Sequence, residues 1–197
     1  MTLQDFISNF DKENTIILLE GKREVPDTDK EKLISLGKLL AQNTKFMKFR
    51  SGNADGSDYL FSSGVSSVDP GRLQVITPYK DHRKKYNQAT ETISLDQIDL
   101  ALEPEVAYLS KKNNKTKHLI DPYLAGEKNQ YIMKAAYIIR DTIKVTGTKK
   151  IPPAAFGIFY DDLKNPRSGG TGHTMNICKI NKIPHVDQTV WFEWLNE

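Results

Sequence analysis

A short apolar run that ends abruptly at a glycine constrains the fold of this chain more than any other feature of its sequence. Residues 15–20 are Thr-Ile-Ile-Leu-Leu-Glu, and the run stops at Gly21. Because apolar and polar positions do not alternate, the run predicts a strand that is buried on both faces. Such strands are typical of parallel sheets covered by helices, so we expect an α/β fold.

Strand-like and helix-like segments alternate along most of the chain. Short apolar runs predict further strands at 46–49, 73–76, 154–160 and 183–186. Apolar residues at helical spacing predict helices at 27–43, 54–67, about 131–147, 169–181 and around Trp191 and Trp194. This order predicts a Rossmann-like, doubly wound, mostly parallel sheet with helices on both faces.

The length and charge of the chain limit its organisation. We expect one domain over residues 1–197, because 197 residues suit a single core, with a polar insertion rich in Lys and Asn at about 79–121. There are 28 Lys and Arg against 25 Asp and Glu, a net charge of +3. Residues 79–150 alone carry +5. The nearly neutral remainder suits one small anion better than a long polyanion.

The sequence excludes several classes of protein. No run approaches the roughly 18–20 apolar residues of a membrane span, and residues 1–14 lack the basic start and apolar core of a secretory signal. We therefore expect a cytoplasmic protein with no membrane partner. Cys178 is the single cysteine, which excludes an internal disulfide and a cysteine zinc site.

The strongest functional signal is a glycine-rich turn before a predicted helix. The turn consists of Ser168, Gly169, Gly170, Thr171, Gly172, His173 and Thr174. Glycines allow the backbone to approach an anion, and free amides, hydroxyl groups and the helix dipole favour phosphate. No Gly-Lys-Ser/Thr follows at the spacing of a Walker loop. The alternative is that the glycines simply join a strand to a helix.

A second turn of small residues lies at 50–58, again between a predicted strand and a predicted helix. Its candidate ligand contacts are Arg50, Ser51, Gly52 and Asp58. A carboxylate in the first helical turn, such as that of Asp58, accepts hydrogen bonds from a ribose. The alternative is that it only complements the positive end of the helix dipole.

These turns resemble those of a known superfamily. The sequence RSGNADGSD at 50–58 looks like the SGxAxGxD turn, and SGGTGHT at 168–174 looks like the later glycine-rich loop, of the SLOG superfamily. That group unites the LOG-type nucleotide phosphoribohydrolases with the Smf/DprA DNA-processing proteins. Gly21 and Arg23 similarly resemble its Gly-Ser-Arg after the first strand, and Arg140 resembles the arginine of its Arg-Asn at the end of a helix.

The resemblance implies a Rossmann-like, nucleotide-binding fold with Gly21, Arg23 and Arg140 near the ligand. It also implies a homodimer in which a helix face is buried. The apolar side of the closing helix, with Trp191 and Trp194, then belongs either to the core or to that contact.

The hydrolase's usual catalytic residue is absent. The corresponding glycine-rich loop of LOG-type enzymes resembles PGGxGTxxE. In this chain the loop reads SGGTGHTMNIC, with Met175, Asn176 and Ile177 where the glutamate would lie. Cleavage of an N-glycosidic bond passes through an oxocarbenium-like state that a carboxylate stabilises. Other candidates for that acid are Asp58, Asp161 and Asp187. His173 is a candidate general acid or phosphate donor, and its alternative is a single structural hydrogen bond.

The remaining histidines and acids predict no metal site. We expect His82 and His118 to face solvent and His185 to be structural, and the four histidines lack the i, i+4 spacing of a zinc site. No cofactor is required by the sequence. Asp161 and Asp162 offer oxygen ligands for Mg²⁺ bound through a phosphate, with a solvated loop as the alternative.

Three functions follow from these observations. The leading hypothesis is a protein that binds or senses a phosphorylated nucleoside or a nucleotide-derived molecule between the turns at 50–58 and 168–174. The second is a nucleoside 5′-monophosphate N-glycosidase. The third is a single-stranded DNA-binding protein that uses Lys84, Lys85 and residues 111–117. The insertion also carries acidic residues and lacks interleaved aromatic residues on which bases could stack. We therefore favour a small-molecule partner over a nucleic acid.

Overall fold

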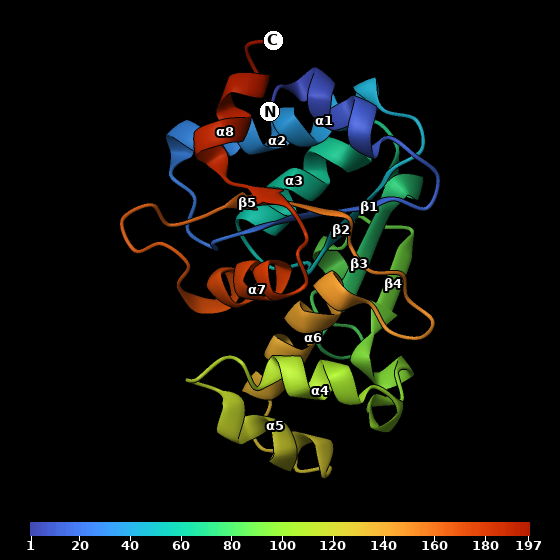
Figure 1. Cartoon of the computed structure of the whole chain (residues 1–197), viewed down its shortest axis with the longest axis vertical. Coiled ribbons are helices and arrows are strands. Elements are labelled where there is room, and N and C mark those ends of the chain that lie inside the picture. The colour runs from blue at the N-terminus through green and yellow to red at the C-terminus, as the bar shows by residue number, and fades with distance from the viewer.

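The computed structural model describes residues 1–197 and contains one sheet of six parallel strands. The strands are β1 (Ile16–Gly21), β2 (Lys48–Ser51), β3 (Leu73–Thr77), β4 (Glu91–Ser94), β5 (Phe156–Tyr160) and β6 (His185–Val186). Their order is β4-β3-β2-β1-β5-β6, so the chain winds outward from β1 in one direction and then continues on its other side (Figure 1). The predicted Rossmann-like fold class is confirmed.

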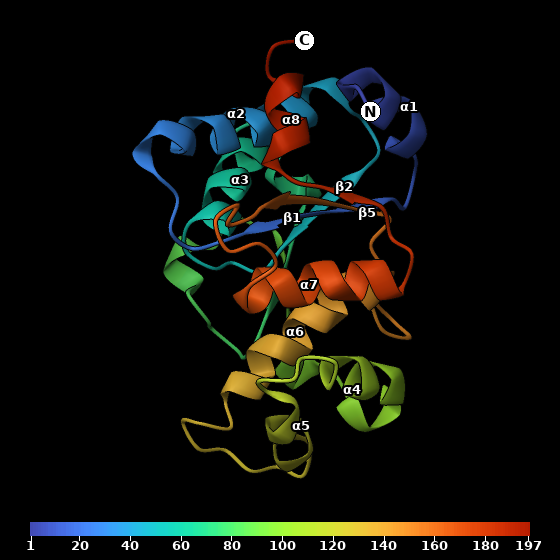
Figure 2. The same cartoon turned by 60° about the vertical axis from the view of Figure 1, so that its left-hand side comes forward.

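The structure has eight α-helices, six of which cover the two faces of this sheet. They are α1 (Leu3–Phe10), α2 (Asp27–Asn43), α3 (Ser57–Ser66), α4 (Pro104–Ser110), α5 (Lys117–Leu124), α6 (Lys134–Thr146), α7 (Gly169–Ile180) and α8 (Gln188–Trp194). Helices α1, α2, α3 and α8 lie on one face and α6 and α7 on the other, with α4 and α5 packed beyond α6 (Figures 1 and 2). None of the helices combines the length and apolar composition needed to cross a bilayer.

The two faces of β1 supply the centre of the core. All of its residues are buried. Ile17 and Leu19 pack into the cluster shared with α2, α3 and α8, whereas Leu18 packs against α7. Trp191 and Trp194 are buried in the first cluster, and Nε1 of Trp191 donates to the carbonyl oxygen of β5 residue Phe159 at 2.9 Å. The closing helix therefore belongs to the core.

Two element boundaries differ from the sequence prediction. Strand β2 spans 48–51 rather than 46–49, because the three preceding amides donate to the carboxylate of Asp11 at 2.7–3.1 Å. Helix α3 begins at Ser57 rather than at residue 54. Asn53 and Gly56 adopt φ values of 55° and 74°, and no right-handed helix passes through such residues.

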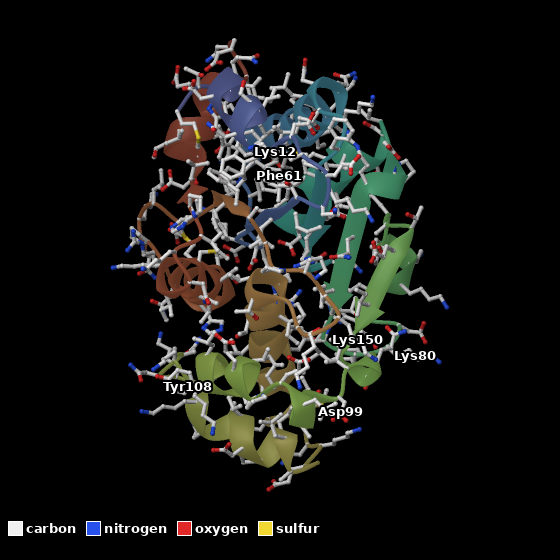
Figure 3. The ribbon with its side chains drawn as sticks, turned by 45° about the vertical axis from the view of Figure 1, so that its right-hand side comes forward. Lys12, Phe61, Lys80, Asp99, Tyr108 and Lys150 are labelled. Carbon is white, nitrogen blue, oxygen red and sulfur yellow. The ribbon has the colours of Figure 1, made fainter.

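The segment at 79–121 is more than a polar insertion. It contributes β4, which pairs with β3 at the edge of the sheet, and it contains α4 and the start of α5. Only Ser94 of β4 is buried, so the strand lacks the apolar run by which the others were predicted. Short 3₁₀ helices connect these elements at Lys84–Tyr86, Leu95–Gln97 and Leu100–Leu102, in addition to one at Pro70–Arg72. Figure 3 shows Lys80, Asp99 and Tyr108 at this end of the molecule, away from Phe61 of the core.

The winding of the chain positions a crevice. Strands β1 and β5 are neighbours, and Gly21 at the end of β1 pairs with Tyr160 at the end of β5. The chain turns from β1 toward β2 on one side and from β5 toward β6 on the other. The loops after such strands diverge, and ligands of open α/β sheets bind at this switch point.

Candidate functional site

A cavity of about 350 Å³ opens at the carboxyl ends of β1 and β2 beside the N-terminus of α7, and we call it the switch-point cavity. Four segments line it: the end of β1, the turn before α3, the middle of α6 and the glycine turn. The lining residues are Glu20, Gly21, Lys22, Arg23, Ala54, Asp58, Tyr137, Ile138, Arg140, Asp141, Ser168, Gly169, Gly170 and Thr171. The structure thus brings together most of the residues that the sequence predicts for a nucleotide site.

Asp58 joins the turn after β2 to the end of β1. Its Oδ2 accepts hydrogen bonds from the backbone N–H groups of Gly52 at 3.0 Å and Ala54 at 3.3 Å, and its Oδ1 accepts one from Gly21 at 3.4 Å. The close packing leaves no room beyond hydrogen at Gly52, where a Cβ would lie 1.9 Å from Nη1 of Arg140. Asp58 therefore sets the shape of the cavity, and its contact with a ribose stays a prediction.

The glycine turn leaves the first amides of α7 without a side-chain cap. Ser168 occupies the N-cap position, but its hydroxyl makes no capping hydrogen bond. Gly169 follows with a φ of 62°, and a Cβ there would meet no atom within 4 Å. At Gly172 a Cβ would lie 1.8 Å from the carbonyl oxygen of Arg167. The turn thus needs glycine and offers free N–H groups in the arrangement that attracts anions.

A network of buried charges lies against this cavity. Nζ of Lys144 contacts Oε2 of Glu20 at 2.7 Å and Oδ1 of Asp141 at 2.9 Å. The same Asp141 oxygen contacts Nε of Arg140 at 3.0 Å, and Nη1 of Arg140 donates to a carbonyl group of the turn after β2 at 2.5 Å. The Thr174 hydroxyl donates to Oε1 of Glu20 at 2.9 Å, which joins α7 to β1.

The surroundings shift the pKa values of Glu20 and Asp141 in opposite directions. Burial raises the pKa of Glu20 to about 7; Lys144 opposes the rise, and the charges of Asp141 and Asp58 add to it. Burial also acts to raise the pKa of Asp141, but Arg140 and Lys144 outweigh it and hold that pKa below its ordinary value. Near neutral pH the cavity therefore offers one ionised carboxylate and one carboxyl group that exchanges its proton.

The sequence prediction did not assign a role to Glu20 or Lys144. Glu20 carries a usable signal, since it is the charged residue within the apolar run of β1. Lys144 carries none, because a lysine in the last turn of a helix ordinarily complements the helix dipole at the surface. Here it is 1% exposed.

Arg50 and Ser51 lie outside the cavity lining. Arg50 is fully buried; its Nε donates to Oε1 of Gln74 at 2.6 Å, and its Nη1 donates to the carbonyl oxygen of Lys144 at 2.9 Å. Burial lowers the pKa of Arg50 to about 10. Its observed contacts join β2, β3 and α6.

The two other acids proposed for catalysis have structural partners. Asp161 accepts a hydrogen bond from the backbone N–H of Arg167 at 2.9 Å, and Asp187 caps α8 by accepting from that of Thr189 at 2.9 Å. Neither lines the switch-point cavity. No three His, Cys, Asp or Glu side chains come together as a metal site.

His82 differs from the expected solvent-facing residue. It is half-buried and packs edge-on against Tyr79, from the segment after β3, and Tyr137 of α6. Burial, with a contribution from the charge of Arg140, lowers its pKa to about 4. His118 is exposed, as predicted.

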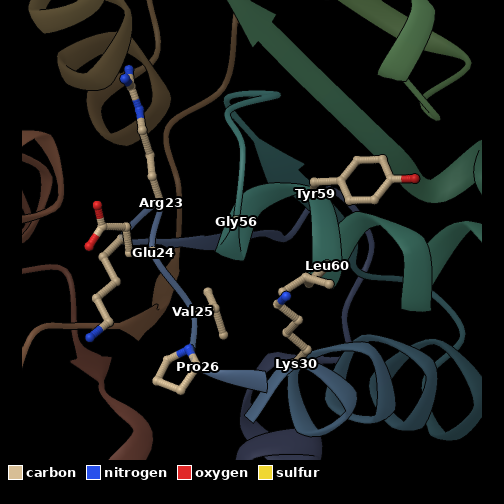
Figure 4. Close-up of a pocket in the computed structure, with 9 residues that line it drawn as sticks. Arg23, Glu24, Val25, Pro26, Lys30, Gly56, Tyr59 and Leu60 are labelled. Carbon is tan, nitrogen blue, oxygen red and sulfur yellow. The ribbon is translucent and has the colours of Figure 1, made fainter. Parts of the chain in front are cut away.

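A more open cavity of about 730 Å³, which we call the outer trough, adjoins the first one at Lys22 and Arg23. Figure 4 shows its lining, which Tyr59 and Leu60 of α3 form together with the loop that follows β1; the ring of Tyr59 points away from that loop. The ring of Tyr59 instead packs edge-on against that of Tyr86, with 6.5 Å between the ring centroids.

Fold and site together define a Rossmann-like α/β protein with a glycine-rich turn at the switch point of its sheet. No protein-family model and no curated protein matches the chain. Among solved structures, DNA processing protein A from Helicobacter pylori, described for its single-stranded DNA binding mode, is similar with a TM-score of 0.50 and 16% identity. The similarity covers 91% of this chain and 67% of that chain, and it shows a DprA-like fold.

Proposed function

We propose that the protein binds a phosphorylated nucleoside, or a nucleotide-derived small molecule, in the switch-point cavity. The observation that carries this proposal is the convergence of two glycine turns and Arg23 on one cavity at the carboxyl ends of parallel strands. Its volume of about 350 Å³ lies within the range of small-molecule sites.

Each wall of the cavity suits a different part of such a ligand. The uncapped amides of the glycine turn suit a phosphate, together with Arg23, which makes no salt bridge. Asp141 and Glu20 suit the hydroxyl groups of a sugar, since both supply acceptor oxygens at the cavity. The outer trough, which adjoins the switch-point cavity at Lys22 and Arg23, then takes the base.

Thermal denaturation with a panel of nucleotides tests the proposal, because a ligand at about 100 times its Kd adds roughly 2.7 kcal/mol to stability. In Gly170→Asp the new Cβ lies 3.1 Å from Oδ2 of Asp141, so a second carboxylate faces the bound phosphate and should abolish the shift. Gly170→Ala adds the same carbon without charge and should retain it. The absence of a shift with every nucleotide, or an equal shift in the aspartate variant, refutes the proposal.

A second candidate function is cleavage of the N-glycosidic bond of a nucleoside 5′-monophosphate. It is favoured by the ionised Asp141 and the proton-exchanging Glu20 in one cavity. In this reaction water replaces the base on the sugar, Asp141 stabilises the oxocarbenium-like state, and Glu20 transfers the proton that leaves with the base. Chromatography should detect free base, and Asp141→Asn should slow its release about 100-fold or more. No release from any common monophosphate removes this candidate.

A third candidate, binding of single-stranded DNA, is favoured by the described ligand of the Helicobacter pylori structure. The lysines proposed for it are Lys84, Lys85 and those at 111–117, of which Lys84 and Lys111 pair with Asp81 and Asp121. A gel shift at two salt concentrations tests it, because phosphate contacts make affinity fall steeply with salt. No complex at low salt removes it.

A further inference from the structure

A second cavity, of about 440 Å³, lies against the glycine turn, and we call it the basic cavity. Ser168, Gly169 and Gly170 line both this cavity and the switch-point cavity, so the turn forms a wall that the two share. The facing wall is the segment 112–116, which connects α4 to α5. The uncapped N-terminus of α7 therefore lies between two cavities.

The two cavities differ in charge. The switch-point cavity has three acidic and three basic side chains in its lining. The basic cavity has Lys112, Lys115 and Arg167 and no acidic side chain. None of these three cations makes a salt bridge, and Nζ of Lys112 is held by the hydroxyl of Tyr108 at 2.7 Å. An anion in this cavity would meet three uncompensated positive charges.

Two buried polar atoms on the lining lack hydrogen-bond partners. They are Nδ1 of His173 and Oγ1 of Thr116, which stand on opposite walls of the basic cavity. His173 is 5% exposed. Buried polar atoms without partners are uncommon and destabilising, so this pair favours a ligand that hydrogen-bonds to both walls of the cavity.

The neighbours of His173 determine which nitrogen is free. Nε2 of His173 lies 3.0 Å from the Thr142 hydroxyl, which donates to the carbonyl oxygen of Ile138 at 3.0 Å. Nδ1 is the ring nitrogen left for a ligand. It accepts a hydrogen bond from a hydroxyl group of a singly protonated phosphate, and once it is itself protonated it donates one to a phosphate oxygen.

We propose that the ligand carries two phosphate groups, with one in the switch-point cavity and the second in the basic cavity on the other side of the glycine turn. The inference rests on the proposed nucleotide-binding function and extends it to a class of ligand: nucleoside bisphosphates and other nucleotides with two separated phosphate groups. The second phosphate contacts Lys115, Arg167 and His173.

Calorimetric titration with adenosine or guanosine 5′-monophosphate and with the corresponding 3′,5′-bisphosphate tests the inference. The bisphosphate should bind at least about tenfold more tightly, as expected for one additional charge-assisted contact. Lys115→Glu combined with Arg167→Glu should remove this advantage and change monophosphate affinity less than about threefold, because neither side chain lines the switch-point cavity and exposed charges interact weakly through water. Both side chains are exposed, so folding should be preserved.

The matched control is Lys128→Glu combined with Lys164→Glu, which changes the net charge equally at exposed positions outside both cavities. It should leave both affinities unchanged. Equal affinities for the two ligands, or a bisphosphate advantage that survives the first double variant, overturns the inference, as does loss of monophosphate binding in that variant. If no nucleotide binds, the proposed function fails by itself. Inorganic phosphate then tests the basic cavity, and binding that the same variant abolishes would support that part alone.

Discussion

Replacement of Glu20 by glutamine should change how the stability of the protein depends on pH. Three buried carboxyl groups, those of Glu20, Asp58 and Asp141, face two buried cations, Arg140 and Lys144. Asp58 has three backbone donors, and Asp141 contacts both cations. The group left to take up a proton is therefore Glu20, in agreement with its pKa of about 7.

The direction and size of the effect follow from this raised pKa. Between pH 4.5 and about 7 the folded state retains the Glu20 proton that the unfolded state releases. The free energy of unfolding therefore falls as pH rises through this window. Each pKa unit corresponds to about 1.4 kcal/mol, so a rise from 4.5 to about 7 gives about 3 kcal/mol. A glutamine has nearly the same shape and cannot ionise, so Glu20→Gln should gain about 3 kcal/mol relative to the unaltered protein between pH 4.5 and 8.

Urea denaturation of both proteins at several pH values between about 4.5 and 8 measures this difference. Glu193→Gln, which removes an exposed carboxyl group, is the control and should follow the unaltered protein at each pH. A difference that stays constant with pH refutes the reasoning. A glutamine variant that is less stable by a constant amount over this range would show that Glu20 is ionised throughout and stabilised by Lys144.

Three further predictions concern the scaffold. Gly64→Ala should destabilise the protein by about 1–3 kcal/mol in urea denaturation, because the new Cβ would lie 2.0 Å from the carbonyl oxygen of Ile34 across the α2–α3 contact. Unchanged stability would show that these two helices can move apart at no cost. Burial acts to raise the pKa of Asp11, but hydrogen bonds from three backbone donors hold that pKa below its ordinary value. Asp11→Asn should therefore lower the free energy of unfolding by about 1–3 kcal/mol at neutral pH, and by progressively less as the pH falls below 4. Cys178 is fully buried, and burial raises the pKa of its thiol to about 12, so a thiol reagent should modify it only in denaturant, and rapid modification of the folded protein would contradict this packing.

The sequence predicted best those elements in which burial produces a regular spacing of apolar residues. Helix α2 has the predicted bounds of 27–43, and β1 has both faces buried. Helix α1 and strand β4 were not predicted. The start of α1 carries a signal, since Thr2 and Asp5 form a capping box. Strand β4 is a short edge strand that forms by pairing with β3, and its own sequence carries no clear strand pattern.

The position of the site was more predictable than its chemistry. Glycine turns at the ends of strands indicate where a cavity forms, and Gly169, Gly170 and Arg23 line it. Arg50 shows the limit of this reasoning. The strand was expected to end before it, which would have placed Arg50 in a loop, but β2 continues to Ser51, so its side chain enters the interior. A two-residue change of strand boundary thus moves an arginine from a ligand contact to a core hydrogen bond.

The distribution of charge limits the size of anion that the site can hold. Residues 79–150 carry the excess of positive charge, and two of their lysines, Lys112 and Lys115, line the basic cavity beside the glycine turn together with Arg167. The switch-point cavity has equal numbers of acidic and basic side chains. A single strand that displaced counterions at these three cations would give a slope of only about −2 in log affinity against log salt concentration. Extended nucleic-acid sites have steeper slopes because more phosphates are neutralised. The proposed function instead uses these cations and the uncapped helix amides for one phosphate group, and the acceptor oxygens of the neighbouring cavity for the hydroxyl groups of the same ligand.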